Sequence, residues 1–182
     1  MSVNPYDQDL GKNPANYQPL TPITFLERSA KVYPNYTAII HGNQRITYGT
    51  FYERSKRLAS ALSMSASIGK GDTVSVMLSN TPSMLEAHYG VPMTGAILQS
   101  INTRLDAAII AFQLDHSDSR VVIVDREFAP VMKEALALAK VRPLIIDYND
   151  TEFPQPHGAI SAIDYEAFVA AGDPNYKWHW PD

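Results

Sequence analysis

The middle of the chain, residues 70–125, alternates short apolar runs with longer stretches in which apolar residues recur at helical spacing. Residues 73–78 and 120–125 are rich in β-branched residues and are preceded or followed by turn-forming residues, which is typical of buried strands. Four consecutive β-branched residues at 121–124 favour a strand that is covered on both faces. A further short strand is predicted at 96–98. The pattern therefore predicts three strands of one sheet.

The segments between these strands carry the signals of helix starts. Thr81 is followed by Pro82, so the threonine can cap a helix whose first position the proline already fits. Gly90 and Pro92 predict a weakened last turn in that helix. Asp106 is the predicted N-cap of the second helix. Strands joined by helices of this length run parallel with right-handed crossovers, so this stretch is predicted to be a βαβαβ unit.

The same signals predict further elements on both sides of this unit. They are a helix from Thr21 to Pro34, a hairpin with strands 37–40 and 44–47, a helix capped by Thr47, a helix at 128–140, a strand at 143–148 and a helix at 164–171. The predicted fold class is α/β: a doubly wound, mostly parallel sheet with helices on both faces, preceded by a small β-hairpin.

The chain is predicted to have three parts. Residues 1–20 contain three prolines and no periodicity, which indicates an extended arm, and residues 21–172 form one α/β subdomain. Residues 173–182 are rich in proline and aromatic residues and are predicted to connect to a further, missing part of the protein. Trp178 and Trp180 are expected to be exposed unless such a part covers them.

Composition narrows the range of functions. The 182 residues are 45% hydrophobic and 19% charged, with a net charge of −4, so no basic patch for nucleic acid or an anionic membrane is predicted. The absence of cysteine excludes disulfides, thiolate catalysis and cysteine-based metal sites. The first residues lack the pattern of a signal peptide, and no apolar run approaches the roughly 20 residues that span a bilayer. A cytoplasmic location without a membrane span is expected.

Open parallel sheets bind ligands beyond the carboxyl ends of their strands, which directs attention to residues 79–81, 100–102 and 125–126. The helix start after Thr81 is better explained as a capped helix than as a phosphate site, because Pro82 removes a donor and no glycine-rich turn precedes it. Neither the dinucleotide-binding glycine pattern nor the P-loop pattern occurs in the chain.

Histidine often serves in proton transfer and metal binding, and the chain has five. His88 and Tyr89, on the first crossover helix, line a substrate tunnel in one interpretation and belong to the core or an interface in the other. His116 ends a helix, where a cation is mildly favourable. No role and no metal site are assigned to the three isolated histidines in predicted loops or turns, His41, His157 and His179.

Two further polar features have simple interpretations beside functional ones. Arg104 lies in the predicted loop at 100–104, where the alternatives for its guanidinium are contact with a neighbouring domain, with a diphosphate or only with local carbonyl groups. Asp115 and Asp118 flank His116, but three neighbouring residues at a helix end do not form a catalytic constellation.

Several short motifs occur in a fixed order along the chain. They are Phe25-Leu26-Glu27-Arg28-Ser29-Ala30, Ile46-Thr47-Tyr48, Gly69-Lys70-Gly71-Asp72-Thr73-Val74, Leu78-Ser79-Asn80-Thr81-Pro82, Gly90-Val91-Pro92-Met93-Thr94-Gly95-Ala96, Asn102-Thr103-Arg104-Leu105 and Val121-Val122-Ile123-Val124-Asp125. In this order and spacing they resemble the amino-terminal part of AMP-forming acyl-CoA synthetases, which belong to the adenylating superfamily. The resemblance runs from about residue 22 to residue 165 and implies the first subdomain of that family's large domain.

The resemblance also implies an activity for a longer protein. Family members activate a carboxylic acid with ATP and Mg²⁺ as an acyl-adenylate and then move the acyl group to CoA. Their Ser/Thr/Gly-rich loop, their Thr-Gly-Asp segment and their carboxy-terminal lysine domain are not in this sequence. The resemblance therefore implies no catalytic or cofactor-binding residue in this chain, and no activity of the chain alone. The implied partners are the rest of the ligase and a carboxylic acid, and the motifs resemble fatty-acyl and short- or medium-chain members most.

Two other hypotheses remain open. One is a self-contained binding or regulatory module that keeps only this subdomain. It predicts polar or paired surfaces where an enzyme fragment exposes apolar ones. The other is an unrelated flavodoxin-like nucleotide binder, which predicts nucleotide binding at the strand ends without any partner.

Overall fold

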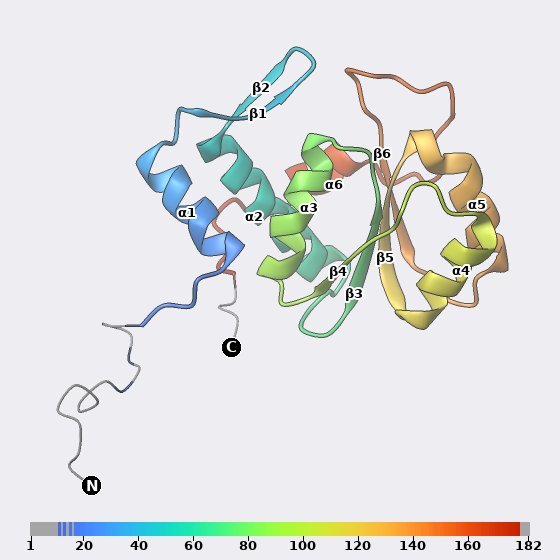
Figure 1. The fold of residues 1–182 in the computed structure, drawn as a ribbon, viewed down its shortest axis with the longest axis horizontal. Helices are drawn as coiled ribbons and strands as arrows, with labels where there is room; N and C mark the ends of the chain where they lie inside the picture. Colours follow the sequence, from blue (N-terminus) through green and yellow to red (C-terminus); the bar gives the residue numbers. More distant parts are fainter. Residues whose placement is uncertain (1–10, 12, 14, 16, 179–182) are drawn as a thin grey trace, which may run out of the picture.

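A computed structural model of the chain describes residues 11, 13, 15 and 17–178, and Figure 1 shows their arrangement. In chain order the elements are α1 (Pro22–Val32), β1 (Thr37–His41), β2 (Gln44–Thr47), α2 (Tyr48–Ser65), β3 (Thr73–Met77), α3 (Pro82–Met93), β4 (Ile97–Ser100), α4 (Ala107–His116), β5 (Ser119–Asp125), the short 3₁₀ helix η2 (Arg126–Phe128), α5 (Ala129–Leu138), β6 (Leu144–Tyr148) and α6 (Tyr165–Ala170). The predicted arm at 1–20 lies mostly outside the described residues.

Four parallel strands form the central sheet, in the order β4-β3-β5-β6. Helices α2, α3 and α6 pack on one face and helices α4 and α5 on the other, so the fold has three layers (Figure 1). The hairpin β1–β2 is antiparallel and forms a separate two-stranded sheet. These features confirm the predicted fold class.

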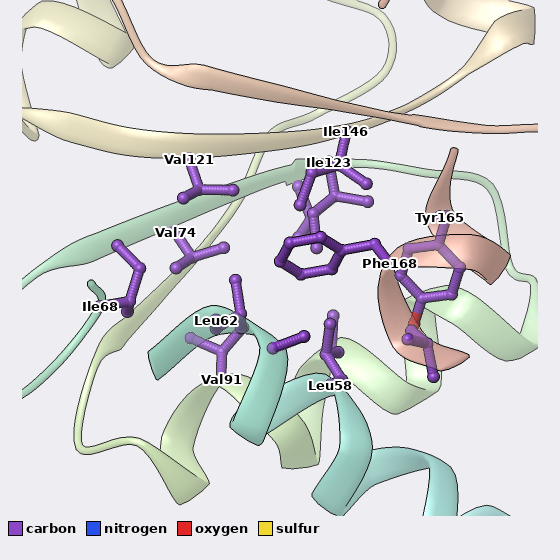
Figure 2. Packing of buried hydrophobic residues seen from close by; sticks show 14 of the residues in the cluster. Leu58, Leu62, Ile68, Val74, Val91, Val121, Ile123, Ile146, Tyr165 and Phe168 are labelled. Atoms are coloured by element: carbon purple, nitrogen blue, oxygen red, sulfur yellow. The ribbon is translucent and has the colours of Figure 1, made fainter. Parts of the chain in front are cut away.

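Alternation along the strands divides the core into two apolar layers. Val121 and Ile123 of β5 belong to the layer of α2, α3 and α6, together with Leu58 of α2 (Figure 2). Val122 and Val124 belong to the opposite layer, beneath α4 and α5. Strand β5 is therefore covered on both faces, as its run of β-branched residues predicts.

Helices α2 and α3 approach each other closely at Gly90. A Cβ atom at this position would lie 2.8 Å from Cδ2 of Leu58, a completely buried side chain. The glycine that was expected to weaken α3 therefore allows the two helices to pack together. Pro92 lies in the last turn, and α3 ends at Met93.

A charged cluster lies between α2, α3 and α6. The Glu86 side chain is completely buried, and it accepts hydrogen bonds from the Arg54 guanidinium and, at 2.7 Å, from the Tyr165 hydroxyl. Arg54 also pairs with Glu166 at 2.8 Å. Burial raises the pKa of Glu86, and the bonds from Arg54 and Tyr165 oppose this shift. The cluster thus joins three helices that are distant in sequence.

Three local details differ from the predictions. Strand β4 extends to Ser100, because the backbone there still pairs with Val76 of β3. Thr81 takes the N-cap position of α3, but its hydroxyl bonds the Ser83 hydroxyl at 2.8 Å instead of a helix N–H. Helix α5 begins after the 3₁₀ turn η2, because Pro130 fits only the first turn of a helix.

The segment after α6 returns to α2. Arg57 donates to the carbonyl of Gly172 at 2.8 Å, and Trp178 Nε1 donates to the Tyr52 hydroxyl at 3.1 Å. Trp178 is partly buried in this arrangement, so the expectation of its exposure is wrong. Trp180 lies outside the described residues.

Candidate functional site

A cleft of about 670 Å³ lies between the hairpin β1–β2 and helix α3. Its walls are mainly apolar. Ile39 and Ile40 of β1 form one wall, and Pro82, Leu85 and Tyr89 of α3 form the other. The chain builds this cleft because the hairpin stands away from the sheet and faces the start of α3 (Figure 1).

A second hollow, of about 330 Å³, lies next to this cleft at the carboxyl ends of β3 and β5. The two hollows share His41, Asn80 and Thr81. Together they form one depression, which we call the strand-end groove. Asp125 and Glu127 line its inner end, so the groove changes from apolar at the hairpin to acidic at the sheet.

Two of the three segments that were predicted from the carboxyl ends of strands meet in the strand-end groove. Residues 79–81 follow β3 and line the groove, and Asp125 ends β5 beside them. The third segment, 100–102, ends β4 at the edge of the sheet and lines neither hollow.

His41 joins the hairpin to the loop after β6. Its Nε2 lies 2.8 Å from Oδ2 of Asp150, and its ring packs edge-on against Phe153 with a centroid distance of 5.2 Å. In the turn of the hairpin, the N–H of Asn43 donates to the Glu152 carboxylate at 2.6 Å. His41 is thus a strand residue with a partner, and its assignment to an isolated loop is wrong. No local pattern could reveal the pair, because its members lie 109 residues apart.

The carboxylates at the ends of β5 and β6 already have partners within the protein. Asp125 accepts the N–H of Glu127 at 3.0 Å, and burial raises the pKa of its carboxyl group. Asp147 pairs with Arg126 at 2.7 Å, and Asp150 pairs with the hairpin histidine. Among the described residues, no group of three or more acidic, histidine or cysteine side chains is arranged to hold a metal ion. These carboxylates therefore do not fit a Mg²⁺ site.

The start of α3 does not fit a phosphate group. Pro82 lies in the first turn and has no N–H, and the Thr81 hydroxyl is directed toward Ser83. Tyr148 adjoins these two hydroxyls, and burial raises the pKa of its phenol. The Tyr148 phenol is thus protonated and neutral where it adjoins these hydroxyls. The hydroxyls at the helix start thus bond to each other instead of pointing toward an anion.

His88 and Tyr89 both line the cleft, and their role in a substrate tunnel stays a prediction. The side chain of His88 is exposed there, and its Nδ1 lies 2.8 Å from the carbonyl of Met84. Tyr89 packs edge-on against Phe51 with a centroid distance of 5.1 Å. The phenylalanine contact holds the tyrosine ring, whereas the His88 side chain is exposed to the cleft.

The other candidate residues lie away from the strand-end groove. His116 stacks on a neighbouring phenylalanine at the end of α4. Asp115 accepts two backbone N–H groups after α5, at 2.7 and 2.9 Å. Arg104 is exposed in the loop after β4 and His157 in the loop after β6, while His179 lies outside the described residues.

Comparison with known families gives a match along most of the chain. Residues 26–174 match the family described as AMP-binding enzyme. A peroxisomal acetate/butyrate–CoA ligase of Arabidopsis thaliana is 47% identical over 184 residues, covering 95% of this chain and 32% of that protein. An acetate–CoA ligase of Humulus lupulus is 42% identical, covering 96% of this chain and 32% of that protein. The chain thus spans about a third of the length of these relatives.

Solved structures share the fold. An anthranilate CoA ligase, AuaEII, in complex with anthranoyl-AMP superposes with a TM-score of 0.77 at 20% identity, covering 87% of this chain and 29% of that one. A benzoate CoA ligase from Burkholderia xenovorans gives a TM-score of 0.74 at 24% identity, covering 88% and 30%. In the part of the chain that the structure describes, no helix is both long and apolar enough to cross a membrane.

Proposed function

Because the chain belongs to the AMP-binding enzyme family, we propose that it is the N-terminal part of an ATP-dependent acid–CoA ligase. Such a ligase activates a carboxylic acid as acyl-AMP and transfers the acyl group to CoA. The observation that carries the proposal is the family match over residues 26–174, together with 47% identity to an acetate/butyrate–CoA ligase.

In this proposal the chain supplies a scaffold and part of a binding wall, and the rest of the ligase supplies the chemistry. The strand-end carboxylates have internal partners, and the start of α3 offers no phosphate cradle. ATP, Mg²⁺ and CoA are therefore bound by residues outside this chain. No residue of the chain is catalytic, and the chain alone is inactive.

His88 and Tyr89 form part of the wall that contacts the acid. Apolar walls favour the hydrocarbon part of a carboxylic acid, and a cleft of about 670 Å³ lies within the usual size range of small-molecule sites. We propose a fatty acid of short or medium chain as the substrate, in keeping with the acetate and butyrate in the name of the Arabidopsis relative.

A cytoplasmic location is also part of the proposal. The peroxisome, which the names of two Arabidopsis relatives state, is the alternative. Microscopy of the full-length protein with a fluorescent tag at its N-terminus distinguishes the two compartments, because that tag leaves the C-terminus free.

A chimera tests the proposed activity. This chain replaces the matching third of the Arabidopsis acetate/butyrate–CoA ligase, and pyrophosphate release and butyryl-CoA formation are measured with ATP, Mg²⁺, butyrate and CoA. We expect both products from the chimera and neither from the chain alone, with the unaltered ligase as the control. A chimera that folds but forms no acyl-CoA would contradict the proposal. It would favour a non-catalytic module that keeps only this subdomain.

A further inference from the structure

The hairpin β1–β2 is attached to the rest of the protein without being part of its core. None of its residues, 37–47, is buried, and none belongs to an apolar core cluster of the described chain. Its two strands form a sheet of their own. Because a two-stranded hairpin is only marginally stable by itself, contacts with other parts of the protein must hold it in place.

Hollows lie beneath both strands of the hairpin. Ile39 and His41 of β1 line the strand-end groove. Ile46 and Gln44, their partners across the hairpin, line a third hollow of about 270 Å³. Pro82 at the start of α3 borders the space beneath both strands. Protein interiors normally fill such space with side chains, so the hairpin spans its surroundings without packing tightly against them.

The base of the hairpin is fixed, but the strand pairing just above it is irregular. The N–H of Gly49 donates to the carbonyl of Pro34 at 2.9 Å and so closes the base. Between Thr37 and Ile39 the register of the two strands shifts, whereas each of residues 39–41 has its partner in β2. A bulge bends a strand where the ladder is interrupted. The shift is thus a point at which the regular outer part of the hairpin can swing on its base.

Two contacts with the loop after β6 hold the far end of the hairpin, and we call them the hairpin clasp. One is the contact of His41 with Asp150. The other is the bond from the N–H of Asn43 to Glu152. The Asp150 carboxylate also accepts the N–H of Glu152 at 3.0 Å, so the loop presents both carboxylates together. Between the two contacts, Gly42 has a φ of +53° and lies so close to Glu152 that a Cβ atom would displace this carboxylate.

We propose that the hairpin is a hinged flap of the strand-end groove, and that the hairpin clasp positions its inner wall against α3. Asp150 and Glu152 are then positioning residues, because they act on a bound acid only through the hairpin. Ile39 and Ile40 form the hairpin wall of the cleft, so release of the clasp lets this wall move and weakens its contact with a hydrocarbon chain. The effect on the acid rests on the proposed function, whereas the hinge does not depend on it.

The distance between two spin labels tests the hinge. The chain has no cysteine, so Arg45→Cys on the hairpin and Leu138→Cys on α5 provide the two attachment sites, and both positions are exposed. Electron paramagnetic resonance then gives the distance between the labels in the 182-residue chain. We expect one narrow distribution with the clasp intact. Asp150→Asn/Glu152→Ala weakens one contact of the clasp and removes the other, and it should add a second population at another distance.

A matched control carries the same two changes elsewhere. Asp118→Asn/Glu134→Ala alters exposed positions that line neither part of the groove, and it should keep the narrow distribution. A narrow distribution in the clasp variant would overturn the inference. A broad distribution with the clasp intact would also overturn it, because the clasp would then not hold the hairpin.

A second variant covers the case in which the first does not fold. Gly42→Ala/Asp150→Asn keeps Glu152 but displaces its carboxylate from the turn, and it should give the same second population. Slow exchange of the Val122 amide in β5 confirms that the sheet is intact in each variant. A folded protein with an unchanged label distance would again overturn the inference.

Kinetics of the chimera described above test the positioning role. Asp150→Asn/Glu152→Ala should raise KM for butyrate about five-fold and change kcat less than about two-fold, because the lost wall contact is made before and in the transition state alike. A purely structural loss of folded protein would instead lower the apparent kcat and leave KM as it is, and this result or an unchanged KM would overturn the positioning role. A chimera that forms no acyl-CoA would count against the proposed function, and the label distances in the 182-residue chain would still decide the hinge.

Discussion

Two side-chain pairs, one an ion pair and the other a histidine–carboxylate hydrogen bond, join distant parts of this chain in different surroundings. Arg54 and Glu86 lie between the helices on one face of the sheet, with Tyr165 as a further donor to Glu86. His41 and Asp150 lie at the rim of the strand-end groove, where they hold the hairpin to the loop after β6. Both pairs are largely buried, but only the first is enclosed by helices of the main core.

The difference shows that the location of a polar side-chain pair decides which part of the structure it stabilises. Without Arg54, Glu86 is left in a dry layer, and three helices lose a common partner. Without the His41 pair, the remaining group meets water as soon as the hairpin moves away. The first pair thus supports the fold, and the second supports the shape of the groove.

Arg54→Met removes the cation that pairs with Glu86, and it has the largest expected effect on stability. It leaves Glu86 buried without its cation, so the free energy of unfolding should fall by about 3–5 kcal/mol in urea denaturation. Arg120→Met is the control, because it removes an exposed pair with Asp72 and should cost about 1 kcal/mol or less. Adding Glu86→Leu to Arg54→Met should recover part of the loss. A loss below about 1 kcal/mol for Arg54→Met would show that the helices do not depend on the pair.

Asp150→Asn tests the contact with His41 at the strand-end groove. It removes the charge that faces His41 but keeps an oxygen for the N–H of Glu152, so the cost in unfolding free energy should be about 1 kcal/mol. Hairpin amides such as that of Ile39 should exchange about five-fold faster, and β5 amides should not change. Asp106→Asn, the same change at the cap of α4, should leave hairpin exchange as it is. Unchanged hairpin exchange in Asp150→Asn would mean that other contacts hold the hairpin.

The smallest effect concerns Asp115, a carboxylate at the surface end of α4. The backbone N–H groups of Val141 and Lys140 lower the pKa of this carboxyl group. Because the folded pKa lies below the unfolded value of about 3.9, the stabilisation is present above about pH 4 and is lost as the pH falls through the folded pKa.

Asp115→Asn should therefore flatten the dependence of the urea midpoint on pH below about pH 4, and should lower the midpoint slightly at pH 7. The wild-type protein, titrated in parallel, is the reference. The same slope in both proteins would show that the two N–H groups contribute nothing to the pH dependence.

The central sheet was predictable because its signals are local. Strands β3 and β5 are marked by β-branched residues beside turn residues, and helix α4 by its cap Asp106, whose carboxylate accepts the N–H of Ile109. The end of β4 was less predictable, because pairing with β3 decides that Ser100 still belongs to the strand. Sequence periodicity thus predicts that a strand exists, whereas pairing with the neighbouring strand decides where it ends.

The strand-end groove was predictable only in part. The rule that ligands gather at the carboxyl ends of strands directed attention to residues 79–81 and to Asp125, and the structure brings these residues together in the groove. His41 and Asp150 were missed, because a contact over 109 residues leaves no trace in local spacing. Glu86 was missed for a related reason: an acidic residue within a helix is usually solvated, and only the packing of α2 and α6 on α3 makes it buried.

Because the chain returns to α2 after α6, some contacts of α2 form only late in synthesis. Tyr52 of α2 is bonded to Trp178, which is synthesised 126 residues later, and Ser63 is bonded to Tyr176, which is synthesised 113 residues later. At about 5–20 residues per second, roughly 6–25 s pass before α2 meets these last partners. During this interval the side of α2 that they cover stays open to chaperones and to other nascent chains. The ribosome thus carries an unfinished subdomain until its final segment has emerged.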